Sequence, residues 1–171
     1  MRSADLCASS IFDVDFLALE KLGVRGVLLD VDNTIVPPRR DRVDTTVGKH
    51  LLQVRLETKI SRWALASNAR RDLSSLAAEL RMEAVQPRWL SAKPRKSFFR
   101  RALAILALEP HEVAMIGDKV LHDISPAARL GLRTVLVKPC WEDQWIDRAL
   151  MRRQRERRRA GVREAWNRQR P

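Results

Sequence analysis

The feature that most constrains this chain is a regular alternation of short apolar runs with segments of helical periodicity. Runs such as Val27-Leu28-Leu29 are apolar at every position, which is typical of strands buried on both faces of a parallel sheet. The segments between the runs repeat apolar residues at the spacing of one helix face. The sequence therefore predicts a single α/β domain, in which a doubly wound, Rossmann-like parallel sheet carries helices on both faces.

The predicted helices and strands follow one another along the whole of this domain. Strands are expected at residues 24–29, 61–66, 84–85, 113–116 and 134–137. Helices are expected at residues 16–21, 46–58, 72–80, 97–107 and 124–130. In such a fold the polar sites lie just beyond the carboxyl ends of the strands, so the residues at those positions are the first candidates for chemistry.

Reactive residues stand at three of the predicted strand ends. Asp30 follows the first strand, with Asp32 two residues further on, and Ser67 follows the second strand. Gly117-Asp118 follows the strand at residues 113–116. Glycine, asparagine and proline are the more common residues where a strand turns into a loop. We therefore interpret these carboxylates and this hydroxyl as parts of one functional site.

The same residues belong to four short motifs in a fixed order. The motifs are Asp30-Val31-Asp32-Asn33-Thr34, Ser67-Asn68, Lys93-Pro94, and Gly117-Asp118 with Asp123. Together they resemble the signature of the haloacid dehalogenase (HAD) superfamily. Their wording is similar to the YqeG family of subclass IIIA phosphatases, which is related to mitochondrial phosphatidylglycerophosphate phosphatase. The resemblance covers about residues 16–139 and implies a HAD-type phosphatase domain.

This resemblance implies a phosphoric monoester hydrolase that works through an aspartyl-phosphate. Asp30 would be the nucleophile, and Asp32 would protonate the leaving oxygen and later accept a proton from water. Ser67 would donate a hydrogen bond to the phosphoryl group, and Lys93 would place a positive charge beside it. Lys93 is preferred over Lys96 as the motif lysine because the Lys-Pro pair matches the family.

The resemblance also implies a magnesium cofactor, because this hard cation prefers oxygen ligands. The expected metal-binding residues are Asp30, Asp32 through its backbone carbonyl, Asp118 and Asp123. The expected substrate-binding and orienting residues are Asn33, Thr34, Asn68, Arg39 and Arg40. Lys119 and His122 depart from the family pattern, and both add positive or titratable character beside the metal-binding loop.

The spacing of the motifs leaves no room for a cap domain. Residues 31–66 must hold a loop, a helix and a strand, and residues 68–92 must hold a helix and a short strand. An uncapped site suits a phosphate presented by a large surface, such as a lipid headgroup, a nucleic-acid end or a protein. By resemblance the expected substrate is phosphatidylglycerophosphate, and a phosphatase for nucleic-acid termini or phosphoproteins is the alternative.

The net charge of +12 is concentrated at the end of the chain. Residues 148–171 contain ten arginines and two glutamates, a charge of +8 that leaves +4 for residues 1–147. We expect residues 1–147 to form the phosphatase domain and residues 148–171 a basic tail. Such a block binds polyanions, so an anionic phospholipid membrane is the expected partner. RNA binding through the tail, or a merely solvated tail, is the alternative.

The tryptophans of the sequence are expected in two kinds of place. Trp141 and Trp145 either join this membrane contact or pack a last helix onto the sheet, whereas Trp63 and Trp89 are expected in the core or the wall of the site. The two cysteines lack CxxC spacing, so neither a disulfide framework nor a zinc site is expected.

No apolar run approaches the length of a membrane span, and residues 1–15 lack the apolar stretch of a secretory signal. We therefore expect a cytoplasmic protein, with peripheral contact at the inner face of the cell membrane.

Overall fold

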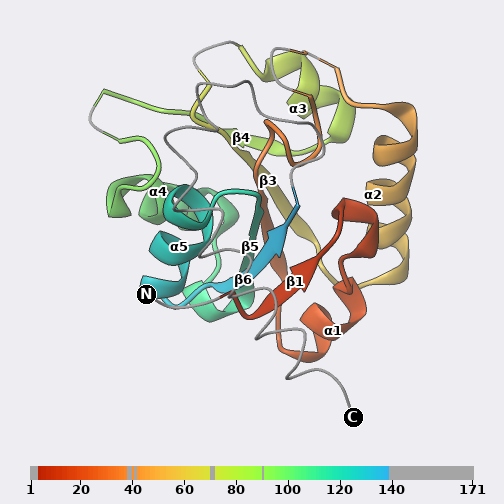
Figure 1. Ribbon diagram of the computed structural model, residues 1–171, viewed down its shortest axis with the longest axis horizontal. Coiled ribbons are helices and arrows are strands. Elements are labelled where there is room, and N and C mark those ends of the chain that lie inside the picture. The colour runs from red at the N-terminus through yellow and green to blue at the C-terminus, as the bar shows by residue number, and fades with distance from the viewer. Residues whose placement is uncertain (1–3, 38–39, 41, 70–71, 90, 139–171) are drawn as a thin grey trace.

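A six-stranded parallel sheet forms the centre of the protein (Figure 1). The computed structural model describes residues 4–37, 40, 42–69, 72–89 and 91–138. The strands are β1 (Leu6–Ala8), β2 (Gly26–Leu29), β3 (Arg62–Ala66), β4 (Glu83–Val85), β5 (Val113–Gly117) and β6 (Arg133–Val137). They lie in the order β1-β6-β5-β2-β3-β4, and every neighbouring pair is parallel. The predicted doubly wound α/β fold is confirmed.

Helices connect the strands on both sides of the sheet. They are α1 (Phe16–Lys21), α2 (Thr45–Glu57), α3 (Ser74–Leu80), α4 (Lys96–Leu106) and α5 (Ser125–Arg129). Shorter turns are the 3-10 helices η1 (Ile11–Asp13) and η2 (Pro110–Glu112) and the π-helical turn η3 (Val120–Ile124). Each predicted helix and strand is present, and its ends differ from the prediction by no more than two residues.

The two faces of the sheet are covered by different helices and form separate cores. On one face α1, α2 and α3 share a core with Val27 and Leu29 of β2. On the other face α4 and α5 share a core with Leu28, and Phe98 and Phe99 of α4 are fully buried there. Successive residues of a strand point to opposite faces. The continuous apolar run in β2 is therefore the consequence of burial on both sides.

The strand order reverses beside β2, and this reversal locates the site. From β2 the chain moves outward to β3 and β4, and then crosses to β5, which pairs with the other edge of β2. A reversal of this kind leaves a crevice beyond the carboxyl ends of the adjacent strands. The residues that follow β2, β3 and β5 are therefore arranged around one crevice. In the described residues between β2 and α4, no further domain interrupts the fold.

The structure also contains one strand that the sequence pattern does not predict. Strand β1 has three residues and pairs with β6 at the edge of the sheet. Just before it, the Asp5 carboxylate accepts hydrogen bonds from the backbone N–H (2.8 Å) and the hydroxyl (2.9 Å) of Thr134. A strand this short shows no periodicity of its own, and the contact that fixes it joins opposite ends of the domain.

The two tryptophans of the described region behave differently. Trp63 is buried, and its indole N–H donates to the Ile60 carbonyl oxygen at 2.8 Å, as expected for a core residue. Trp89 is 102% exposed, so its expected placement in the core or the wall of the site is wrong. It lies in the loop between β4 and α4, where the chain turns back on itself between Arg88 and Ser91.

Several sequence-based expectations fall on residues outside the described part of the chain. These are Arg39, Trp141, Trp145, the boundary at residue 147 and the basic tail at residues 148–171. Within the described part, none of the helices combines the length and the apolar character that crossing a bilayer would require.

Candidate active site

Three neighbouring strands bring the predicted site residues together at one edge of the sheet. Leu29, the last residue of β2, pairs with Leu65 of β3 and with Ile116 of β5. The next residue, Asp30, continues this register, because its backbone N–H donates to the Ile116 carbonyl oxygen at 2.9 Å. Asp30 thus lies between the ends of β3 and β5, which are followed by Ser67 and Asp118 respectively.

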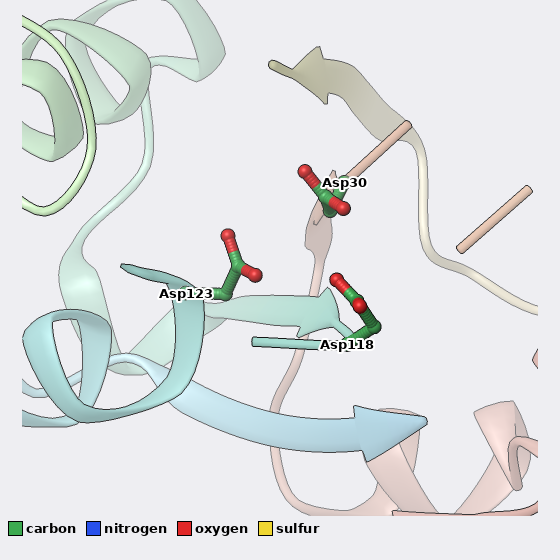
Figure 2. Close-up of side chains that lie close together, drawn as sticks. All are labelled: Asp30, Asp118 and Asp123. Atoms are coloured by element: carbon green, nitrogen blue, oxygen red, sulfur yellow. The ribbon is translucent and has the colours of Figure 1, made fainter. Parts of the chain in front are cut away.

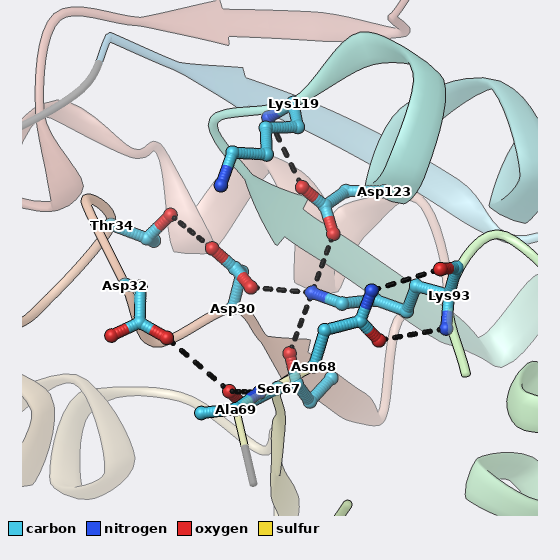
Figure 3. A network of polar contacts seen from close by, with 10 residues as sticks. Asp30, Asp32, Thr34, Ser67, Asn68, Ala69, Lys93, Lys119 and Asp123 are labelled. Atoms are coloured by element: carbon cyan, nitrogen blue, oxygen red, sulfur yellow. Dashed lines mark hydrogen bonds and ion pairs between the residues drawn. The ribbon is translucent and has the colours of Figure 1, made fainter. Parts of the chain in front are cut away.

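The Asp30 carboxylate is buried and held from both of its oxygens (Figure 3). The Lys93 ammonium donates to Oδ1, and the Thr34 hydroxyl donates to Oδ2 at 3.1 Å. Burial raises the pKa of Asp30 above its ordinary value, while the positive charge of Lys93 opposes that rise. Both donors stabilise the ionised carboxylate and fix its orientation.

Lys93 is the buried cation of the site, and all three of its ammonium hydrogens are used. It donates to Asp30, to Asp123 Oδ1 at 2.7 Å and to the Ala66 carbonyl oxygen at 2.7 Å. Burial alone would lower the pKa of Lys93, but the charges of Asp123 and Asp30 raise it above its ordinary value. Lys96, the other candidate lysine, is exposed at the start of α4.

Asn68 holds the backbone of Lys93 in place. Its side-chain amide donates from Nδ2 to the Lys93 carbonyl oxygen at 2.8 Å and accepts at Oδ1 from the Lys93 N–H at 2.8 Å. A paired contact of this kind fixes both distance and direction between two segments. The segment after β3 therefore determines where the lysine of the third motif enters the site.

Three buried acids form a cluster that could hold a metal ion (Figure 2). Asp30, Asp118 and Asp123 each offer a carboxylate oxygen, and these oxygens lie within 4.8 Å of one another. Carboxylate oxygens are the ligands of hard divalent cations. In addition, three buried carboxyl groups lie beside the buried ammonium of Lys93, and a cation would balance the excess negative charge that they carry when ionised. The residues present fit a divalent ion.

Gly117 makes room for the Asp123 carboxylate. A Cβ atom placed on Gly117 would lie 2.8 Å from Asp123 Cγ and 2.9 Å from its Oδ2. Asp123 belongs to η3, and its Oδ2 accepts from the Lys119 backbone N–H at 3.1 Å. The sequence motif includes Gly117, but no role is predicted for this glycine from the sequence alone. A glycine at the end of an otherwise apolar strand could have indicated that a side chain packs closely against the backbone there.

Asp32 and Ser67 form a second polar pair beside Asp30 (Figure 3). The Ser67 hydroxyl donates to Asp32 Oδ2 at 3.4 Å and accepts from the Ala69 N–H at 2.9 Å. Asp32 is partly exposed and does not belong to the buried acid cluster. The next residue, Asn33, has a φ of 68°, a left-handed conformation that asparagine tolerates better than most residues. The chain therefore turns sharply at this point, and the two acids of the motif occupy different surroundings.

Lys119 is the remaining candidate whose charge interacts with the acids. Its side chain extends from the end of β5 toward Asp30 (Figure 3). Burial would lower its pKa, but the charges of Asp118, Asp30 and Asp123 raise it. Arg40 is exposed, and His122 is partly buried within η3.

Comparison with known proteins places this fold and site. The family model described as HAD-hydrolase-like matches residues 91–139. The chain is 27% identical to the probable phosphatase YqeG of Bacillus subtilis (strain 168) over 135 residues, which are 79% of this chain and 76% of that protein. It is 48% identical to phospholysine phosphohistidine inorganic pyrophosphate phosphatase of Xenopus laevis over 46 residues, 27% of this chain and 17% of that protein.

The fold is also similar to that of solved structures. An uncharacterized protein from Listeria monocytogenes serotype 4b superposes with a TM-score of 0.56 at 19% identity, over 71% of this chain and 84% of that chain. The open parallel sheet, with its acids at the carboxyl ends of β2 and β5, agrees with the match of residues 91–139 to the HAD-hydrolase-like family model. Within this class, the chain is similar to the YqeG-like phosphatases of the HAD superfamily. The comparisons accordingly support a phosphoric monoester hydrolase.

Proposed function

We propose that this protein is a magnesium-dependent phosphatase that cleaves a phosphate monoester through an aspartyl-phosphate on Asp30. One observation carries the proposal. Asp30 lies buried where the strand order reverses, is paired with Lys93, and shares a cluster with Asp118 and Asp123 whose oxygens lie within 4.8 Å of one another. A nucleophile, a fixed cation and an acidic metal site are the parts that phosphoryl transfer needs.

In the first step a carboxylate oxygen of Asp30 attacks phosphorus, and the bond from phosphorus to the leaving oxygen breaks. Hydrogen bonds from Thr34 and Lys93 favour the ionised carboxylate and align it for this attack. The leaving oxygen takes a proton from Asp32, which must therefore enter the reaction as a carboxylic acid. Asp32 is partly exposed, so both water and a bound substrate could reach it.

In the second step water attacks the phosphorus of the aspartyl-phosphate. Asp32, now a carboxylate, accepts a proton from this water, the bond between phosphorus and the Asp30 oxygen breaks, and inorganic phosphate leaves. The Ser67 hydroxyl, which donates to Asp32 in the absence of substrate, would turn its one hydrogen to a phosphoryl oxygen. Asp30 is then again a carboxylate and Asp32 again a carboxylic acid, as at the start of the cycle.

Asp30, Asp118, Asp123 and the backbone carbonyl of Asp32 are the proposed magnesium ligands. The ion would reduce the repulsion between the phosphate dianion and the Asp30 carboxylate. Lys93 contributes to the same end from the protein side, because its charge sits between Asp30 and Asp123.

The proposed natural substrate is phosphatidylglycerophosphate, which would be converted to phosphatidylglycerol. The open site supports this proposal, since no cap domain in the described residues encloses the crevice and a small metabolite would be surrounded on few sides. The basic tail at residues 148–171 would add peripheral contact with an anionic membrane.

Phosphate release measured with added Mg²⁺ tests both levels of the proposal. We expect Asp30→Asn to abolish turnover of every substrate, and phosphatidylglycerophosphate to be hydrolysed faster than 5′-phosphorylated oligonucleotides, a phosphopeptide or small phosphomonoesters. Asp15→Asn is the matched control, because Asp15 caps α1 and asparagine caps a helix equally well. Full activity of Asp30→Asn would refute the mechanism, and faster turnover of an oligonucleotide or phosphopeptide would replace the substrate.

A further inference from the structure

The loop that joins β4 to α4 extends away from the body of the domain (Figure 1). Two backbone hydrogen bonds close it, from Arg88 N–H to the Ser91 carbonyl oxygen (3.1 Å) and from Ser91 N–H to the Arg88 carbonyl oxygen (2.5 Å). The chain therefore turns back on itself, and Trp89 lies at the turn. We refer to residues 86–89 and 91–92 as the Trp89 loop.

Trp89 presents its whole side chain to the outside. It is 102% exposed, more than any other large apolar residue in the described part of the chain. Its backbone φ of +27° is also unfavourable for a residue with a side chain. The Trp89 indole does not pack in the core, and the backbone at this residue has an unfavourable conformation, so Trp89 does not stabilise the fold. A role in contact with another surface explains its place better than a role in stability.

The stretch of sequence that contains Trp89 is rich in basic residues. Residues 86–108 contain no aspartate or glutamate. The basic residues in this stretch are Arg88, Lys93, Arg95, Lys96, Arg100 and Arg101. Lys93 is committed to the active site, whereas Arg88, Arg95, Lys96 and Arg100 are exposed. We call these four exposed residues the basic rim.

The Trp89 loop is attached to the active site at both of its ends. At one end Gln86 donates from Nε2 to the Ala69 carbonyl oxygen at 3.4 Å, and its own carbonyl oxygen accepts from the Arg101 guanidinium. At the other end Lys93 is paired with Asn68. Ala69 and Asn68 directly follow Ser67. Both ends of the Trp89 loop are therefore held by residues of the segment that follows β3 at the site.

We propose that the Trp89 loop and the basic rim dock this protein onto an anionic phospholipid surface. Indole rings favour the headgroup zone of a bilayer, and arginine and lysine are attracted to anionic lipids. Docking there would bring a phosphorylated headgroup to Asp30 without removing the lipid from the bilayer. This purpose rests on the proposed phosphatase function, while the docking itself is a separate property of the surface.

The arrangement of aromatic residues favours a lipid over a nucleic acid. Proteins that hold single strands stack successive bases on several aromatic side chains. In the part of the chain that the structure describes, Phe12 is the one other exposed aromatic residue, and it contacts His50 of α2, with ring centroids 5.1 Å apart. A single exposed indole among cations suits insertion into an interface better than stacking along a strand.

Co-sedimentation with vesicles tests the docking directly. The full-length chain is mixed with vesicles of phosphatidylcholine and phosphatidylglycerol in equal parts, and with pure phosphatidylcholine. We expect Arg88→Glu to weaken partitioning onto the anionic vesicles by about 30-fold, because about 1 kcal/mol per charge near the surface is about fivefold and two charge units change. Trp89→Ser should weaken it by at least about fivefold. The matched controls are Arg129→Glu and Leu56→Ser, whose side chains are exposed on α5 and α2.

A soluble phosphomonoester separates this result from the phosphatase proposal. Arg88→Glu and Trp89→Ser should hydrolyse it like the unmodified protein, while losing activity on lipid phosphate in vesicles. If partitioning falls no further in these variants than in the two controls, the docking surface is refuted, whatever the enzyme does. Loss of binding to a single-stranded oligonucleotide with unchanged vesicle partitioning would overturn it in favour of nucleic acid. Absence of turnover in every protein, with vesicle binding lost as expected, would refute the proposed function alone.

Discussion

Replacing Lys93 by methionine should destabilise the metal-free protein more than any exposed charge change. The side chains of Lys93, Asp30 and Asp123 are 3%, 7% and 0% exposed, and the lysine pairs with both acids. Removing one partner of a buried ion pair costs about 3–5 kcal/mol, because the other charge stays buried without compensation. For a domain of this size the loss corresponds to a fall in Tm of about 6–20 °C.

The pH dependence of this loss has a definite sign. Burial already raises the pKa of Asp30, and without Lys93 this pKa should rise further above that of an aspartate in the unfolded chain, which is about 4. A carboxyl group with a raised folded pKa weakens the fold once the pH exceeds the unfolded pKa, and does so fully above the folded pKa. The difference between variant and unmodified protein should therefore shrink from about pH 8 to about pH 5.

Chemical unfolding followed by circular dichroism, with EDTA and with excess Mg²⁺, measures this effect. Magnesium should stabilise both proteins, because it binds the folded state, and should stabilise Lys93→Met more, because the acids of the variant have lost the positive charge of Lys93. Lys96→Met is the matched control, because Lys96 lies three positions away and is exposed. Equal stability of the two variants in EDTA would show that the buried ion pairs do not hold this site together.

Three further changes test the site and its surroundings. Gly117→Ala should lower Mg²⁺ affinity and activity by about tenfold or more, because the new methyl group would displace Asp123 at a cost of about 1–3 kcal/mol. Its control is Gly48→Ala, where the nearest atom to the new methyl group is 3.9 Å away. Alanine at this position should stabilise α2, as thermal unfolding would show. Asp32→Asn should abolish hydrolysis of alkyl phosphates but spare the first step with p-nitrophenyl phosphate, whose leaving group needs no proton; an equal loss in single-turnover kinetics for both would contradict the acid role. Lys119→Gln should raise KM severalfold with a smaller change in kcat, and an unchanged KM would show that this ammonium does not meet the substrate.

The fold followed from the sequence because its strongest signals are local. Each central strand is buried on both faces and is therefore continuously apolar, as Val27-Leu28-Leu29 shows. The positions of Asp30, Ser67 and Asp118 at one edge follow from parallel strands alone. What sequence could not supply was the choice of partners, such as the contact of Lys93 with Asp123 rather than with another acid.

The predictions failed for strand β1 and for Trp89, where contacts between residues far apart in the sequence outweigh the local sequence pattern. Strand β1 is too short to show a periodic pattern. Asp5 fixes it by a hydrogen bond with Thr134, which is distant in the sequence. Trp89 is apolar and so was expected to be covered, but the turn between Arg88 and Ser91 carries it outward. Burial of a loop residue depends on the path of the chain around it, which hydrophobicity does not encode.

The complete use of the Lys93 ammonium limits how this lysine can take part in turnover. Its three hydrogens are held by two carboxylates and by the carbonyl oxygen of Ala66, so it cannot swing toward an incoming group without giving up a bond. Its effect on a developing negative charge is then that of a stationary field, already oriented before the substrate arrives. Changes in geometry during a catalytic cycle would have to come from the substrate and from the more exposed side chain of Asp32.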